Sequence, residues 1–132
     1  MISLVWWLRV VGLMYLVHFV AMVVARAPIK TLGPAGALDR AAAGEPLARF
    51  LVDTWVVFGL ENLAIGAALL LASRVPEQAR LLAWAVIGIE VTRGIIADVY
   101  MIARGNNART SGVWIAIHSV VIATGVLALR GG

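Results

Sequence analysis

Long apolar stretches, at about residues 2–25, 50–72, 80–103 and 112–129, restrict the folds that this chain can adopt. A helix of about 20 residues crosses a hydrocarbon layer of roughly 30 Å, and each stretch is near that length. The sequence therefore predicts an all-α fold in which four transmembrane helices form an up-down-up-down bundle. We expect this bundle to be a single integral membrane domain over residues 1–132.

The connections between the stretches predict how the helices follow one another. Residues 27–49 combine several Gly and Pro residues with an Ala-rich piece, so we expect a long loop with a helical turn or two. The links at 73–79 and 104–109 are short, which makes the helices they join antiparallel neighbours. Lys and Arg are more frequent in 26–49 and 104–109 than on the opposite side, so the positive-inside rule favours both termini outside the cytoplasm.

Composition supports a membrane environment and excludes several classes of function. Hydrophobic residues make up 62% of the chain and charged residues 14%, which is outside the range of soluble domains. The net charge of +4 does not indicate nucleic-acid binding, because most arginines flank apolar stretches, as expected for contacts with lipid headgroups. The chain has no cysteine, so disulfides, thiolate metal ligands and cysteine nucleophiles are excluded.

Polar side chains within the apolar stretches are the main functional signal. An ionised group at the bilayer centre costs about 2.5 to 3.5 kcal/mol, so each such residue is a functional candidate. The candidates for proton exchange are Glu61, Glu90, Asp98, His18 and His118. The candidates for binding are Arg93, Asn62, Tyr15, Asp53 and Trp114, although Trp114 also has the placement of an aromatic that only anchors a helix at the interface.

The acidic candidates outnumber the basic group that could neutralise them. Residues three, four or seven apart share a helix face, so Glu90, Arg93, Gly94, Ala97 and Asp98 form one stripe on the third stretch. A purely structural interpretation pairs Arg93 with Glu90 or Glu61 as a buried ion pair. One arginine cannot neutralise Glu61, Glu90 and Asp98 together, so at least one acid is expected to be protonated, solvated or bound to a ligand.

His18 and His118 lie at similar predicted depth in the first and fourth stretches. The structural interpretation is that they are two separate histidines, each hydrogen-bonded between helices. A shared site would instead suit zinc or iron, or haem held between two imidazoles. The chain has no Glu-x-x-His or His-x-x-His spacing, so we predict no cofactor and keep a metal or haem as the alternative.

These observations favour a polar cavity that binds a small lipophilic molecule and, as an enzyme, would transform it by acid–base chemistry. Arg93 with one acid would organise the site, while a second acid and a histidine exchange protons. The first alternative is a proton- or ion-coupled transporter or channel, which requires a homo-oligomer because four helices enclose only a narrow path. The second alternative is a structural subunit of a membrane complex.

Three segments carry a resemblance to a known family. They are FLVDTW at residues 50–55, GLEN at residues 59–62 and GIEVTRGIIADVY at residues 88–100. In these segments the chain resembles small bacterial four-helix membrane proteins of the BphX-like group, with DoxX-like proteins as a looser comparison. Sterol-isomerase-type proteins are more distant, since residues 90–98 do not reproduce their pattern. The resemblance implies a four-helix fold in the bacterial inner membrane and assigns no residue roles.

Overall fold

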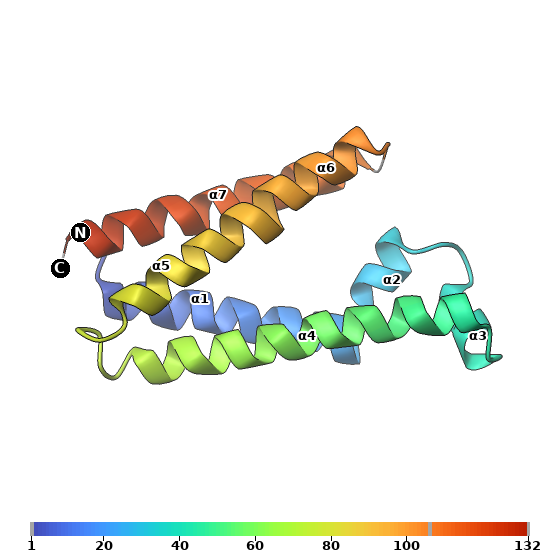
Figure 1. Cartoon of the computed structure of the whole chain (residues 1–132), viewed down its shortest axis with the longest axis horizontal. Coiled ribbons are helices and arrows are strands. Elements are labelled where there is room, and N and C mark those ends of the chain that lie inside the picture. The colour runs from blue at the N-terminus through green and yellow to red at the C-terminus, as the bar shows by residue number, and fades with distance from the viewer. Residues whose placement is uncertain (1, 106, 132) are drawn as a thin grey trace. The chain divides into compact units, whose positions relative to one another are not determined.

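The computed structural model describes residues 2–105 and 107–131, and every regular element in those residues is helical (Figure 1). An all-α fold is therefore confirmed. The elements, in which η marks a π-helix, are α1 (Leu4–Phe19), η1 (Val20–Val24), α2 (Ala27–Leu32), α3 (Ala37–Ala42), α4 (Pro46–Ala72), α5 (Arg80–Ile89), η2 (Glu90–Ile96), α6 (Ala97–Ala103) and α7 (Ala108–Arg130). Residues 1 and 132 of the predicted domain, and Asn106 of the predicted 104–109 turn, lie outside the described residues.

Three helices are long and apolar enough to cross a membrane. They are Leu4–Val24, which joins α1 and η1, then Pro46–Ala72 and Ala108–Arg130. Residues 80–103 form a further unbroken run of helix, made of α5, η2 and α6. Length and composition therefore indicate a membrane protein with three helices able to span the bilayer and one helical run that carries charged side chains along its length.

Local sequence explains where several helices begin. Pro46 is the first residue of α4, where its missing N–H costs nothing, so this helix starts before the apolar run that predicts it. Asn107 caps α7, because its side-chain oxygen accepts hydrogen bonds from the backbone N–H groups of Arg109 and Thr110, at 3.1 and 3.3 Å. The segment 27–49, predicted to be a loop with helical turns, contains the short helices α2 and α3.

The chain forms two compact units. Unit 1 comprises Met1–Val11 and Leu69–Gly132, and unit 2 comprises Gly12–Ala68. Helices α1 and α4 each pass from one unit into the other.

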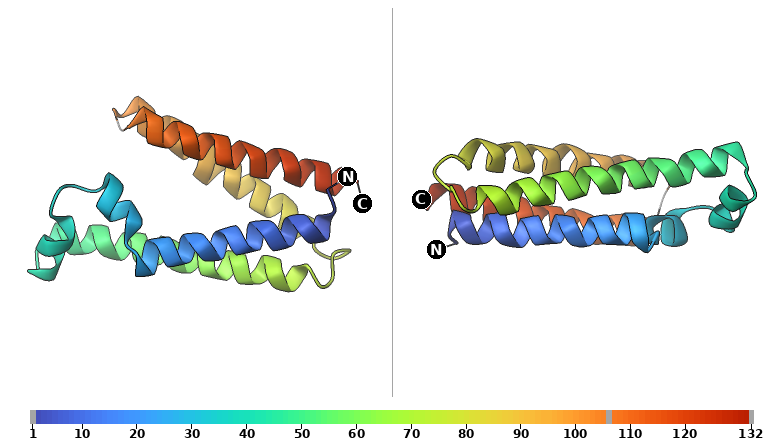
Figure 2. Two further views of the ribbon diagram at one scale, coloured as in Figure 1. Left: turned by 180° about the vertical axis from the view of Figure 1, so that it is seen from behind. Right: turned by 90° about the horizontal axis from the view of Figure 1, so that it is seen from below.

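In unit 2, the second half of α1 and η1 pack antiparallel to α4 (Figure 2). Glycines permit this contact, because a Cβ on Gly66 would lie 2.8 Å from the backbone oxygen of Gly12. Further along, a Cβ on Gly59 would lie 3.2 Å from the Cβ of Met22. Small residues at such crossings let helix backbones approach closely in a membrane. The short helix α3 lies beside the first turns of α4 (Figure 2).

In unit 1, α7 runs antiparallel to α5, η2 and α6 along their whole length (Figure 1). At one end, Nη2 of Arg80 donates a hydrogen bond to the backbone oxygen of Leu129 at 2.6 Å. The first turns of α1 pack on the same helix, where the indole N–H of the buried Trp7 donates to the backbone oxygen of Val121 at 3.1 Å. These polar contacts and the buried Leu8 hold three segments of unit 1 together.

Candidate functional site

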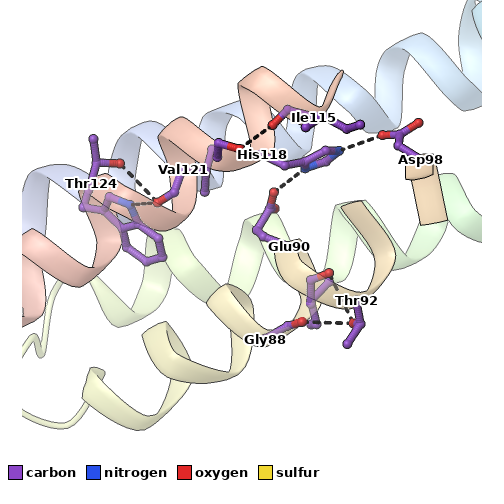
Figure 3. Close-up of polar contacts among 11 residues, drawn as sticks. Gly88, Glu90, Thr92, Asp98, Ile115, His118, Val121 and Thr124 are labelled. Atoms are coloured by element: carbon purple, nitrogen blue, oxygen red, sulfur yellow. Dashed lines mark hydrogen bonds and ion pairs between the residues drawn. The ribbon is translucent and has the colours of Figure 1, made fainter. Parts of the chain in front are cut away.

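Unit 1 brings together three of the predicted site residues: the imidazole of His118 in α7 lies between the carboxylates of Glu90 and Asp98 (Figure 3). Nδ1 of His118 lies 2.5 Å from Oε2 of Glu90, the first residue of η2. Nε2 of the same ring lies 3.8 Å from Oδ2 of Asp98 in α6. Glu90 is buried, with 3% of its side chain exposed, whereas the side chains of His118 and Asp98 are each 19% exposed. We name Glu90, His118 and Asp98 the acid–imidazole cluster.

The π-helical segment η2 positions the two acids of this cluster. In a regular α-helix, residues eight apart differ by about 80° around the axis, so Glu90 and Asp98 would only partly share a face. A π-helix closes its hydrogen bonds from residue i to i+5, so each turn holds more residues and each residue advances by a smaller angle. Residues Glu90–Ile96 have this geometry, and both carboxylates reach one imidazole. π-helical turns are frequent at functional sites.

Gly94 allows α7 to approach η2 closely enough for this contact. A Cβ at position 94 would lie 2.5 Å from Cγ of His118 and 2.6 Å from its Nδ1. Ordinary carbon contacts are about 3.5 to 4.0 Å, so any side chain at this position would push the ring away. Gly94 itself is buried, and the imidazole lies directly over it.

The partners of the two ring nitrogens of His118 restrict where the protons of the acid–imidazole cluster can lie. A neutral imidazole has one donor and one acceptor nitrogen, yet both nitrogens of His118 face carboxylate oxygens. Three arrangements satisfy these contacts: an imidazolium between two carboxylates, a protonated Glu90 that donates to Nδ1 while Nε2–H faces Asp98, or a protonated Asp98 that faces Nε2 while Nδ1–H donates to Glu90. All three arrangements contain two protons and carry one net negative charge, and each of the last two differs from the imidazolium form only in the position of one proton. The geometry therefore suits reversible proton exchange.

Two other predicted residues lie in the same unit. The ring of Trp114 is tilted against that of His118, with centroids 6.2 Å apart, so it covers one side of the imidazole. Arg93 is half-buried in η2.

The remaining predicted residues belong to unit 2. Tyr15 and Asn62 are buried, and the side-chain amide of Asn62 lies 3.2 Å from the sulfur of Met22. His18 is half-buried, while Asp53 and Glu61 on α4 are exposed. Among the described residues there is no group of three or more His, Asp and Glu side chains suited to a metal ion.

The family assignment rests on a match along nearly the whole chain. The model of the BphX-like family matches residues 1–131. The chain belongs to the BphX-like family. One relative is an uncharacterized BphX-like protein of Burkholderia cepacia, 32% identical over 124 residues that cover 91% of this chain and 86% of the relative. An uncharacterized BphX-like protein of Paraburkholderia xenovorans strain LB400 matches with the same identity and coverage. No solved structure matches this chain.

Membership in the BphX-like family confirms the resemblance that three sequence segments indicated. One of those segments, residues 88–100, contains Glu90, Gly94 and Asp98. One of the segments that carried the resemblance thus also forms one side of the acid–imidazole cluster.

The structure adds a second polar feature that sequence reasoning did not treat as a site. Arg26 and Arg49 of unit 2 line a cavity of about 450 Å³ together with Asp53. From the sequence, these arginines served only to predict which loops face the cytoplasm. The available signal was their position at the ends of two apolar stretches, on either side of the segment that folds back as α2 and α3.

Proposed function

We propose that this protein binds a small lipophilic molecule within the membrane and exchanges a proton with it through the acid–imidazole cluster. The observation that carries this proposal is the placement of His118 between a buried Glu90 and a partly exposed Asp98. Buried carboxylates are retained in lipid only where they are paired or functional, so a paired and proton-sharing cluster is a candidate site.

Each member of the cluster has a distinct part in this proposal. Glu90 fixes the orientation of the imidazole through Nδ1 and supplies or accepts the shared proton. Nε2 of His118 lies on the more exposed side, where a hydroxyl or carbonyl group of the ligand could exchange a proton with it. Oδ2 of Asp98 lies 3.8 Å from Nε2, close enough for the same ligand group to contact both the imidazole and this carboxylate.

Native mass spectrometry of the purified chain in mild detergent tests the proposal. The parent protein should retain a small molecule that Glu90→Gln retains weakly or loses, because glutamine keeps the size and a hydrogen bond but cannot take up a proton. Glu77→Gln is the matched control, since Glu77 is an exposed acid in the connection between α4 and α5. Equal ligand retention by the parent and Glu90→Gln would contradict a role for the cluster.

A transport function would give a different result in the same set of proteins. The cluster would then act as one step of a proton relay, and the parent protein in vesicles would carry a proton flux that Glu90→Gln abolishes. Such a flux, with no small molecule retained by the parent, would refute ligand binding in favour of transport.

We further propose that residues 80–103 form a fourth span, in an up-down-up-down bundle of the bacterial inner membrane with both termini outside the cytoplasm. A helix of 24 residues is about 36 Å long at 1.5 Å per residue, enough to cross the hydrocarbon layer. Pairing within the cluster lowers the cost of placing Glu90 and Asp98 there.

Single cysteines test this topology, because the chain has none of its own. Gln78→Cys and Ala103→Cys bracket the proposed fourth span, and both positions are exposed. A membrane-impermeant maleimide should label position 78 in intact spheroplasts and position 103 only after permeabilisation. Labelling of both positions from the same side would show that residues 80–103 do not cross.

A further inference from the structure

We infer that the cavity lined by Arg26 and Arg49 in unit 2 is a binding site for the phosphate group of an anionic amphiphile. The cavity has a volume of about 450 Å³ and lies between α3, the first turns of α4 and Arg26, which directly precedes α2. Its remaining walls are the acid Asp53 and small or aliphatic side chains of α3 and α4. This inference is independent of the acid–imidazole cluster, which belongs to unit 1.

Arg26 is the first residue of this cavity that favours an anion. Its Nη1 atom is buried and, within residues 2–105 and 107–131, has no hydrogen-bond acceptor. A buried donor without a partner is costly, and more so when it carries charge. The backbone of Arg26 is also in the left-handed region, at φ 53° and ψ 30°, where residues other than glycine are uncommon. Arg26 thus lines the cavity with a strained backbone conformation and with one guanidinium donor lacking an acceptor.

Arg49 supplies a second positive charge at the cavity. Its Nε donates to the backbone oxygen of Ala41 in α3 at 3.2 Å, which orients the guanidinium without neutralising it. Gly44, at φ 94°, leaves room beside this group, since a Cβ there would lie 3.3 Å from Nη2 of Arg49. Among the described residues, neither Arg26 nor Arg49 forms an ion pair with a carboxylate.

The charges and shape of the cavity favour a phosphate group. Two arginines and the single acid Asp53 leave one net positive charge at the wall. Guanidinium groups bind phosphate oxygens through paired N–H donors, and two of them can hold one phosphate between them.

The surroundings favour an amphiphile over a fully soluble phosphate compound. Arg26 follows the end of an apolar helix at Val24, which is the depth at which arginines meet lipid headgroups. The first turns of α4 expose large apolar side chains nearby, with Leu47 at 73% and Phe50 at 69% exposure. Acyl chains would cover such side chains while the headgroup phosphate reaches the arginines.

Lipid retention by the full-length protein tests this inference. The protein is exchanged into mixed micelles with equal amounts of phosphatidylglycerol and phosphatidylcholine, and bound lipid is measured by native mass spectrometry. Loss of one charge-assisted contact should weaken phosphatidylglycerol binding by about ten- to a hundredfold in Arg26→Gln and in Arg49→Gln. Arg40→Gln is the matched control: it removes the same charge from α3, but Arg40 is an exposed residue that pairs with Glu45.

The outcomes separate the possible sources of the phosphate. Selective retention of phosphatidylglycerol that falls in Arg26→Gln and Arg49→Gln, but less than twofold in Arg40→Gln, supports a lipid headgroup. Displacement of that lipid by millimolar inorganic phosphate supports the same site with a soluble source. Equal losses in all three variants would show general electrostatic attraction and overturn the inference. So would retention of neither lipid together with no binding of inorganic phosphate.

Discussion

Gly94→Ala is the substitution that most directly tests how the acid–imidazole cluster is built. The added Cβ would lie 2.5 Å from Cγ of His118, about 1 Å inside normal contact. Either α7 moves away from η2 or the imidazole leaves Glu90, and both responses lose packing. Gly88→Ala is a matched control on the preceding helix, because a Cβ at position 88 has nothing within 4 Å.

The difference between the two alanine variants isolates the packing cost. Alanine in place of glycine within a helix is favourable by about 0.5 to 1 kcal/mol, and this gain applies at both positions. Overpacking costs about 1 to 3 kcal/mol and applies only at position 94. Gly94→Ala should therefore be less stable than Gly88→Ala by about 1 to 3 kcal/mol, a five- to 150-fold difference in the ratio of folded to unfolded protein.

Reversible unfolding in mild detergent measures this difference, and a double-mutant cycle identifies its source. In a His118→Ala background the ring is absent, so Gly94→Ala should lose most of its cost and give a coupling energy of about 1 to 3 kcal/mol. Equal stability of Gly94→Ala and Gly88→Ala, or a cost at position 94 that persists without the imidazole, would refute the packing described for Gly94 and His118.

Two further predictions concern how α7 is held in unit 1. Gly125→Ala should lower the free energy of unfolding by about 1 to 3 kcal/mol relative to Gly112→Ala. A Cβ at position 125 would lie 2.7 Å from Cζ2 of Trp7, whereas a Cβ at position 112 has nothing within 4 Å. The same unfolding assay would contradict this contact if the two variants matched. Arg80→Gln should cost about 1 kcal/mol by removing the 2.6 Å hydrogen bond to the backbone oxygen of Leu129, and an unchanged stability would show that this bond contributes nothing.

The helices could be predicted from the sequence because their signal is local. In lipid, backbone N–H and C=O groups must be hydrogen-bonded within the protein, and an apolar run of about 20 residues achieves this within its own segment as a helix. The ends were less well predicted where a proline or a cap, and not hydrophobicity, sets the boundary: α4 begins at Pro46 and α7 is capped by Asn107. The π-helical geometry of η1 and η2 was not predicted, because it depends on how neighbouring helices pack and not on the residues alone.

The site could be predicted only in part, for a related reason. Helical periodicity placed Glu90 and Asp98 on one helix face. It could not predict how the neighbouring helix is rotated, and this rotation decides which side chain meets the two acids. The sequence offered Arg93 as the partner of either Glu90 or Glu61, and the structure places His118 against Glu90. The cue was Gly94, one turn from Glu90, since a glycine in a polar stripe marks a point where another helix approaches closely.

The acid–imidazole cluster also holds helices together, so a test of its chemistry must separate this structural role from function. Lipid gives no hydrophobic driving force between helices, so close packing at Gly94 and polar contacts such as Glu90 to His118 are what hold the α5–η2–α6 run against α7. Removing the carboxyl of Glu90 altogether would disturb packing and proton exchange at once. Glu90→Gln keeps the volume and can donate from its amide to Nδ1 while Nε2–H still faces Asp98. A loss of ligand retention in Glu90→Gln at parental stability would therefore be attributable to the proton that glutamine cannot carry.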